Sequence, residues 1–222
     1  MEKLKITTFM GRVWFNLTEN IDQKLLSKIR NKKIKNKDFT IISNNCFAGW
    51  VYRTYNLPYQ TPTAGLFIMP QCYLKLIKNI KHYMEKDIVF ISEEESMYKE
   101  YLKQKSEKFG QYPIGKIDDI EIHFLHYKTK EEAKEKWNRR KKRINYDKII
   151  YKFNDQNGCT LQNIKEFINN DKLKHKICFV SNKDYNIEGT YFIKEFDKNK
   201  YVINDTWFCR KYINLTKLIN NI

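Results

Sequence analysis

Short apolar segments alternate with longer amphipathic segments along most of this chain. The short segments, each bounded by polar or turn-forming residues, predict strands at 39–42, 65–69, 88–91, 120–127, 149–153 and 176–180. The amphipathic spacing predicts helices at 21–36, 47–55, 70–84, 92–108, 130–143, 160–168 and from 214. Because strands and helices alternate, we expect an α/β fold, a three-layer sandwich with a largely parallel sheet.

The C-terminal part of the chain departs from this alternation. Segments 190–196 and 200–203 flank the turn-forming residues 197–199, which predicts a hairpin and therefore an antiparallel edge on the sheet. No internal repeat, low-complexity tract or long linker divides the chain, so we expect one domain. Its expected parts are a basic helical segment at 1–37, a core at 38–182, and the hairpin with a closing helix at 183–222.

Polar side chains follow several predicted strands. If the sheet is parallel, the carboxyl ends of its strands share one rim, where ligands bind in such folds. That rim would collect residues 43–46, 127–128, 154–159 and 181–183. Asn, Asp and Ser also end strands for local reasons, because they hydrogen-bond their own backbone. From the rim we select Asn44, Asn45 and Asp155 as substrate-binding candidates.

Cys46 is the sharpest catalytic candidate, because it stands where a helix is predicted to begin. Unpaired N–H groups at a helix N-terminus stabilise a thiolate and lower the pKa of the thiol. In the predicted strand 120–127, Glu121 and His123 project from the same face. Cys46, His123 and Glu121 could therefore act as nucleophile, base and orienting group. The competing interpretation is a buried thiol and a core histidine, which are common in folded proteins.

Basic and aromatic residues near these turns add binding candidates. Arg53 follows Cys46 on the same predicted helix, and His126 ends the strand that carries His123. The cations that could hold a phosphate or diphosphate are Arg53, Lys128, Arg139, Arg140 and Arg143. Asp118, Asp119 and Glu121 are conceivable metal ligands, but their spacing matches no recognised site, so we predict none. No nucleotide or cofactor motif is present.

Composition narrows the class of protein. A hydrophobic content of 41% with 15% aromatic residues indicates a globular chain. The formal net charge of +16 could indicate nucleic-acid binding, but the basic residues gather in predicted helices and are better explained as solvated faces. Five cysteines without close spacing indicate free thiols in a reducing compartment. No signal peptide is evident, so we expect a cytoplasmic protein, with peripheral contact with the anionic inner face of the membrane as an option.

Three long segments carry a family resemblance. They read IISNNCFAGWVYRTYNLPYQTPTAGLFIMPQCYLKL, then YPIGKIDDIEIHFLHYKTKEEAKEKWNRRKKRIN, then YKFNDQNGCTLQNIKEFINN followed by KICFVS. They resemble a bacterial family associated with exopolysaccharide and capsule biosynthesis, over about residues 38–182. The resemblance implies that pathway and an α/β fold, and it brings no established catalytic residues.

Together these features favour a transferase that acts on a sugar, nucleotide-sugar or lipid-linked sugar in surface-polysaccharide assembly. Acyl and glycosyl transfer both stay open, because the first requires Cys46 as nucleophile and the second only the polar rim. The alternative is a non-catalytic binding or assembly protein of the same pathway, docking on anionic membrane or an acidic partner. Nucleic-acid binding is the weakest hypothesis, and no nucleic-acid partner is expected.

Overall fold

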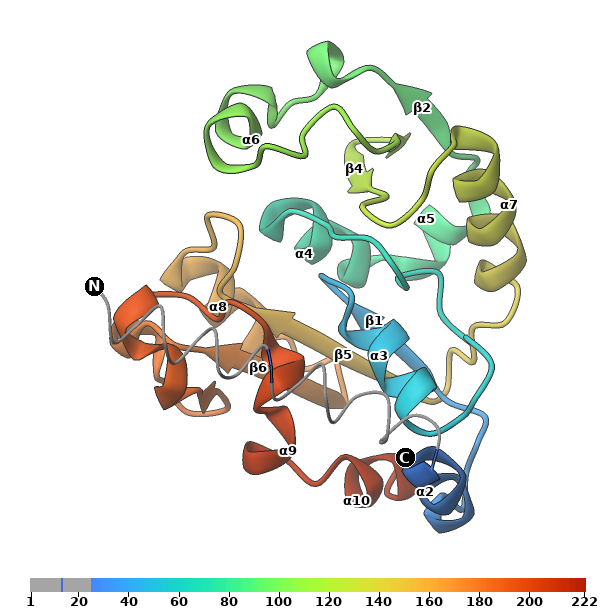
Figure 1. The fold of residues 1–222 in the computed structure, drawn as a ribbon, viewed down its shortest axis with the longest axis vertical. Helices are drawn as coiled ribbons and strands as arrows, with labels where there is room; N and C mark the ends of the chain where they lie inside the picture. Colours follow the sequence, from blue (N-terminus) through green and yellow to red (C-terminus); the bar gives the residue numbers. More distant parts are fainter. Residues whose placement is uncertain (1–12, 14–24) are drawn as a thin grey trace.

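A computed structural model describes residue 13 and residues 25–222, and within this part the chain forms two sheets surrounded by helices (Figure 1). The larger sheet has four strands, all parallel, in the order β1-β5-β6-β7. They are β1 (Thr40–Ser43), β5 (Ile149–Asn154), β6 (His175–Val180) and β7 (Tyr191–Phe192). The smaller sheet is antiparallel and consists of β2 (Val89–Ile91), β3 (Ile114–Ile117) and β4 (Ile120–His123).

Helices cover both faces of the parallel sheet, so the expected three-layer α/β sandwich is confirmed. Ile42 and Phe153 pack on one face with α4 (Pro70–Lys78) and α8 (Leu161–Ile168). Ile41 and Phe179 pack on the other face against α3, α9 and α10. Those helices are α3 (Phe47–Thr54), α9 (Cys209–Tyr212) and α10 (Leu215–Asn220). The apolar character of consecutive strand residues follows from this burial on both faces.

The segments 88–91 and 120–127, expected in the parallel sheet, instead form the separate antiparallel sheet with β3. The reason is the two-residue turn Asp118–Asp119, where Asp118 adopts a positive φ of 54° and reverses the chain between β3 and β4. Strand β3 is not among the predicted strands, because Gly110 and Gly115 favour a loop in this segment. A Cβ atom on Gly115 would lie 2.3 Å from Cδ1 of Ile88, so the close approach explains the glycine.

The predicted C-terminal hairpin is wrong. Tyr191 and Phe192 pair in parallel with β6, and residues 194–199 form a 3₁₀ helix. Lys200 then adopts a left-handed conformation with φ of 60°. Beyond it, the N–H of Val202 donates to Oδ1 of Asp155 at 2.7 Å. The chain is thereby held at the end of β5 and does not return along β7.

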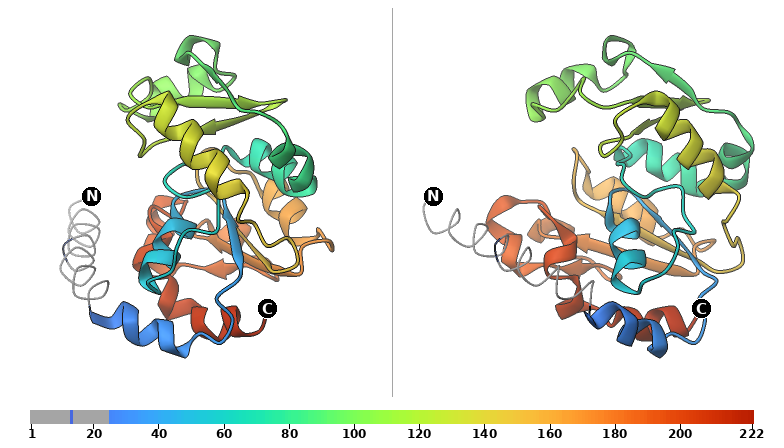
Figure 2. Two further views of the ribbon diagram at one scale, coloured as in Figure 1. Left: turned by 90° about the vertical axis from the view of Figure 1, so that its right-hand side faces the viewer. Right: turned by 45° about the vertical axis from the view of Figure 1, so that its right-hand side comes forward.

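Most of the segment between β1 and β5 folds into a second lobe, which contains the small sheet. This lobe stands over one edge of the parallel sheet (Figures 1 and 2). Helix α4 contacts both β4 and α8, and so joins the two sheets. The other helices of this segment are α5 (Ile80–Glu85), α6 (Lys99–Lys105) and α7 (Lys130–Lys141). Helix α7 runs diagonally along the small sheet with Ala133 and Trp137 buried (Figure 2).

The helices predicted at 130–143 and 160–168 each begin directly after a capping residue. The hydroxyl of Thr129 accepts from the N–H of Glu132 at 3.1 Å, and Thr160 caps α8. Ser92 and Glu95 also form a capping box, but it opens a 3₁₀ turn, Glu93–Glu95, before α6. Short 3₁₀ turns at Lys183–Tyr185 and Asp205–Trp207 follow later in the chain.

The basic helix predicted at 21–36 corresponds to α2 (Ser27–Lys33). Three apolar side chains in or just before this helix are exposed: Leu25 by 66%, Leu26 by 41% and Ile29 by 52%. Residues 21–24 of that prediction lie outside the described part of the chain. Among the described residues, no helix combines the length and apolar character needed to cross a bilayer.

Candidate functional site

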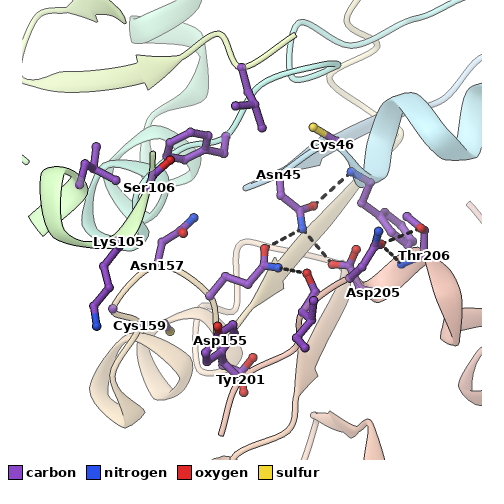
Figure 3. Close-up of a pocket in the computed structure, with 18 of the residues that line it drawn as sticks. Asn45, Cys46, Lys105, Ser106, Asp155, Asn157, Cys159, Tyr201, Asp205 and Thr206 are labelled. Atoms are coloured by element: carbon purple, nitrogen blue, oxygen red, sulfur yellow. Dashed lines mark hydrogen bonds between the residues drawn. The ribbon is translucent and has the colours of Figure 1, made fainter. Parts of the chain in front are cut away.

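A cavity of about 890 Å³ lies at the carboxyl edge of the parallel sheet, between this sheet and the segment around α6 (Figure 3). The ends of β1 and β5 supply one side, α6 and the residues after β4 supply another, and residues 200–206 close the third. The lining includes Asn45, Cys46, Arg53, Tyr101, Lys105, Lys108, His126, Asp155, Gln156, Asn157, Lys200, Tyr201, Asn204 and Asp205. Of the predicted rim, residues 45–46 and 155–159 line the cavity, whereas residues 127–128 and 181–183 do not.

Asn45 is held in place by hydrogen bonds on both ends of its amide. Its Nδ2 donates to Oε1 of Gln156 and to Oδ2 of Asp205, each at 3.1 Å (Figure 3). Its Oδ1 accepts from the N–H of Phe47 at 3.1 Å and from Nζ of Lys152 at 3.0 Å. Asn45 thus joins the ends of β1 and β5 to the C-terminal part of the chain and presents a fixed edge to the cavity.

Asn44, the other predicted amide, is buried and does not line the cavity. Its Nδ2 donates to Oδ1 of Asn154 at 2.8 Å, and Nδ2 of Asn154 donates to Asp205 at 2.9 Å. These hydrogen bonds cross from β1 to β5 beneath the cavity. Asn44 is therefore placed to support the cavity wall and not to contact a ligand directly.

Lys152 and Asp205 form a buried ion pair at the centre of this network, which the sequence analysis missed. Both side chains are almost fully buried, and Nζ of Lys152 also lies 5.4 Å from the centre of the Phe47 ring. Burial lowers the pKa of Lys152, and the charge of Asp205 opposes that shift. The one available signal was a lysine between Tyr151 and Phe153 in an otherwise apolar strand. Its partner, Asp205, lies 53 residues further along the chain and could not be inferred from the sequence.

Asp155 lines the cavity, but its carboxylate is occupied by backbone donors. Oδ2 accepts from the N–H groups of Ser181 at 2.7 Å and Asn182 at 3.2 Å, and Oδ1 accepts from Val202 at 2.7 Å. Burial raises the pKa of Asp155, and these hydrogen bonds oppose the shift. The geometry assigns Asp155 to positioning the loops around the cavity.

Cys46 stands at the N-cap of α3, as predicted, and its sulfur lies on the cavity wall (Figure 3). The predicted lowering of its pKa is wrong. Burial and the nearby Asp205 raise the pKa of the thiol to about 11, although Arg53 and Lys152 act in the other direction. The thiol donates to the carbonyl oxygen of Leu66 at 3.6 Å. Desolvation outweighs the helix N-terminus, so Cys46 is a neutral thiol near pH 7.

The structure does not assemble Cys46, His123 and Glu121 into a hydrogen-bonded triad. The imidazole of His123 stacks on Phe67 with a centroid distance of 4.5 Å, and neither ring nitrogen has a hydrogen-bond partner among the described residues. Burial lowers the pKa of His123 to about 3. Its Nε2 lies 3.8 Å from Oε2 of Glu121, too far for a hydrogen bond.

Glu121 has other partners. Its carboxylate accepts from the hydroxyl of Ser96 at 2.7 Å and from the N–H of Met97 at 2.8 Å, which ties the start of the α6 segment to β4. Asp118 pairs with His82, and Asp119 with Lys75. The two aspartates thus have partners of their own, and the described residues hold no cluster of three His, Cys, Asp or Glu suited to a metal ion.

Arg53 and His126 both reach the cavity from different halves of the molecule. His126 is exposed, and partial desolvation together with Lys108 and Arg53 lowers its pKa. A lowered pKa favours the neutral imidazole, the form that can accept a proton. His126 was predicted as a binding residue because it ends a predicted strand, and it lies in the turn after β4, on the cavity lining.

Comparisons with known proteins place the chain in a family. A family model described as "Domain of unknown function (DUF1919)" matches residues 17–222. A protein of Haemophilus influenzae strain KW20, described as "Uncharacterized protein", is 30% identical over 179 residues, which are 80% of this chain and 78% of the relative. The match extends beyond the 38–182 core on which the sequence resemblance was based. The chain is therefore a member of the DUF1919 family.

Proposed function

We propose that this protein is a glycosyltransferase that binds a nucleotide-sugar in the cavity at the carboxyl edge of its parallel sheet. The observation that carries the proposal is the composition of that cavity, in which unneutralised cations, aromatic rings and amides converge. We further propose that the reaction belongs to surface-polysaccharide assembly, and the support for this pathway is the resemblance of residues 38–182 to a family associated with exopolysaccharide biosynthesis.

The charge of the cavity favours an anionic ligand. Lys105, Lys108 and Lys200 line it, and the structure records no ion pair for any of them among the described residues. Of the lining carboxylates, Asp205 is paired with Lys152, and Asp155 is occupied by backbone N–H groups. The positive charge that faces the cavity is thus available to the diphosphate of a nucleotide-sugar.

The remaining lining suits a sugar or a base. Tyr101, Tyr185 and Tyr201 offer aromatic rings on which a flat apolar face can pack. Asn157 offers an amide that can both donate to and accept from hydroxyl groups. Asn204 offers its Nδ2 as a donor, because its Oδ1 already accepts from the N–H and the hydroxyl of Thr206. Together with the cations, these groups match each chemical part of a nucleotide-sugar. The cavity volume of about 890 Å³ falls within the range of sites for molecules of this size.

His126 is the group best placed to act as general base in the proposed reaction. The bond between the sugar C1 and the phosphate oxygen breaks, and its electron pair leaves on the nucleoside diphosphate. An acceptor hydroxyl oxygen forms the new bond to C1, and its proton passes to the neutral imidazole of His126. The lysines stabilise the negative charge that develops on the departing diphosphate. Acyl transfer through Cys46 is less well supported, because its thiol is protonated and donates to the carbonyl oxygen of Leu66, with no hydrogen bond to a base among the described residues.

Removing two cavity cations is expected to weaken nucleotide-sugar binding. UDP-glucose or another nucleotide-sugar should raise the melting temperature of the wild-type protein, because it binds the folded state. The Lys105→Gln/Lys200→Gln variant should increase the Kd about 100-fold, since each of the two lost charge-assisted contacts contributes about 1.5 kcal/mol. Isothermal titration across a panel of nucleotide-sugars and acyl-CoA measures this.

The matched control is Lys172→Gln/Lys174→Gln, which removes the same charge from exposed residues outside the cavity lining. Equal weakening in both variants would mean that only the overall charge matters. A response to acyl-CoA without any response to nucleotide-sugars would contradict the proposed donor class.

His126→Gln is expected to retain donor binding while slowing turnover by about 10²-fold or more, because the general base is lost. Turnover is followed as release of nucleoside diphosphate with cell-wall or capsular sugar acceptors. Cys46→Ser is the comparison variant and should keep wild-type turnover. Loss of turnover in Cys46→Ser with His126→Gln unaffected would instead support covalent catalysis. Donor binding with no turnover in the wild type would favour a binding or assembly protein.

A further inference from the structure

A second hollow, of about 490 Å³, lies where the C-terminal end of α7 meets the loop after α3. Four of the described residues that line it are arginines: Arg53, Arg139, Arg140 and Arg143. The remaining lining comes from residues 56–59, and none of the lining residues is acidic. We call this the arginine cavity. Arg53 also lines the larger cavity, so the two adjoin.

Arg140 is a buried cation with neutral partners. Only 8% of its surface is exposed, and Nη1 donates to the hydroxyl of Tyr127 at 2.5 Å and to the carbonyl oxygen of Ala64 at 3.3 Å. Its guanidinium stacks 4.7 Å from the centre of the Tyr59 ring. No carboxylate lies within ion-pair distance of it among the described residues. Burial of an uncompensated charge is costly, and an anionic ligand would offset that cost.

Tyr59 also accepts hydrogen bonds from two other arginines of the arginine cavity. Nη1 of Arg53 donates to its hydroxyl at 3.2 Å, and Nη1 of Arg143 donates to its carbonyl oxygen at 3.3 Å. Arg139 is different, because its Nε pairs with Glu135 at 2.7 Å. Three guanidinium groups are therefore oriented around one residue without a carboxylate to neutralise them. Their spacing is fixed by hydrogen bonds before any ligand arrives, which lowers the entropy cost of binding.

We propose that the arginine cavity binds a diphosphate group, at a site separate from the nucleotide-sugar cavity. Guanidinium groups bind phosphate oxygens through paired N–H donors, and three of them match the charge of a diphosphate. The diphosphate can belong to a soluble molecule or to the headgroup of a prenyl lipid. This inference rests on the arginines alone and holds whether or not the larger cavity binds a nucleotide-sugar.

The test is titration of the full-length protein with inorganic pyrophosphate. Arg143→Gln is the informative variant, because Arg143 is exposed and lines only the arginine cavity. We expect its Kd to rise about tenfold, the loss of one charge-assisted contact. Lys142→Gln removes the same charge from the adjacent exposed residue and should leave the Kd unchanged. Arg140→Met is a less informative variant, since loss of a buried stacking residue can impair folding.

Two further experiments distinguish the arginine cavity from the larger cavity, and a lipid-bound diphosphate from a soluble one. In the Lys105→Gln/Lys200→Gln background, which removes two cations of the larger cavity, Arg143→Gln should still raise the Kd for pyrophosphate about tenfold. No effect of Arg143→Gln in that background would place the anion in the larger cavity and overturn the proposal. Phosphatidylcholine vesicles with a few per cent prenyl diphosphate, compared with phosphatidylglycerol vesicles of equal charge, test the lipid source. Selective binding to the former supports a lipid diphosphate, and binding of free pyrophosphate alone supports a soluble one. The site would be refuted if neither pyrophosphate nor the prenyl diphosphate vesicles bound. It would also be refuted if Lys142→Gln raised the Kd as much as Arg143→Gln.

Discussion

Asp205→Asn is expected to lower the free energy of unfolding by about 3–5 kcal/mol, because it leaves the ammonium of Lys152 buried without a charged partner. Both side chains of the pair are almost fully buried, so water cannot replace the lost carboxylate. The same oxygen of Asp205 also accepts from Asn45 and Asn154, and these hydrogen bonds hold the cavity wall. Urea unfolding monitored by circular dichroism measures the change.

An exposed ion pair provides the matched control. Asp197 pairs with Lys183, whose side chain is 72% exposed, so Asp197→Asn should change the free energy of unfolding by no more than about 1 kcal/mol. Lys152→Met in the Asp205→Asn background should recover stability, because no buried charge remains. An Asp205→Asn protein as stable as wild type would show that Lys152 is neutral in the folded state and that the pair is not ionic.

The stability of the protein is expected to fall as the pH drops from about 6.5 towards 3, by about 1.4 kcal/mol per pH unit, because of His123. Burial lowers the pKa of His123 to about 3 in the folded state, whereas an unfolded histidine has a pKa near 6.5. Between these values the unfolded chain binds a proton that the folded chain does not. The unfolded state therefore gains free energy as the pH falls, and the contribution of His123 is constant above about pH 7.

His123→Phe isolates this contribution from other titrating groups. The phenyl ring can keep the stack on Phe67, and the imidazole nitrogens have no hydrogen bond to lose. Urea unfolding of both proteins at pH 7.5, 6, 5 and 4.5 gives the comparison. The difference in free energy of unfolding should shift in favour of the variant by about 2–3 kcal/mol across this range. A difference that does not change with pH would mean that His123 is protonated or solvated in the folded state.

The larger cavity and the arginine cavity are held in shape by different parts of the molecule. The wall formed by Asn45 and Asp205 is fixed by the buried network beneath it, so changes there should affect stability and ligand binding together. The arginine cavity is held by Tyr59 and the end of α7, and Arg143 can be changed at the surface. Arg53 lies in the lining of both, which makes it the residue through which the two sites adjoin.

Signals that act over a few residues could be interpreted from the sequence. The strand that precedes Cys46, the helix that begins after it, and the caps at Thr129 and Thr160 depend on neighbouring residues and are present as predicted. The sheet arrangement was less accessible, because a strand's apolar pattern is similar in a parallel and a buried antiparallel sheet. The turn at Asp118 settled the direction of β4, and the hydrogen bond from Val202 to Asp155 prevented the C-terminal hairpin.

The sequence by itself determined an α/β protein with a polar rim after β1, β5 and β6, since period-two and helical patterns and turn residues are local properties. Tertiary structure decided the chemistry of that rim. Cys46 became a neutral thiol because burial outweighs its position at a helix start, and His123 became a core residue because Phe67 covers it. Burial and the pairing of Lys152 with Asp205, distant in sequence, are set only when the chain packs, because desolvation and charge pairing depend on what surrounds each group in space.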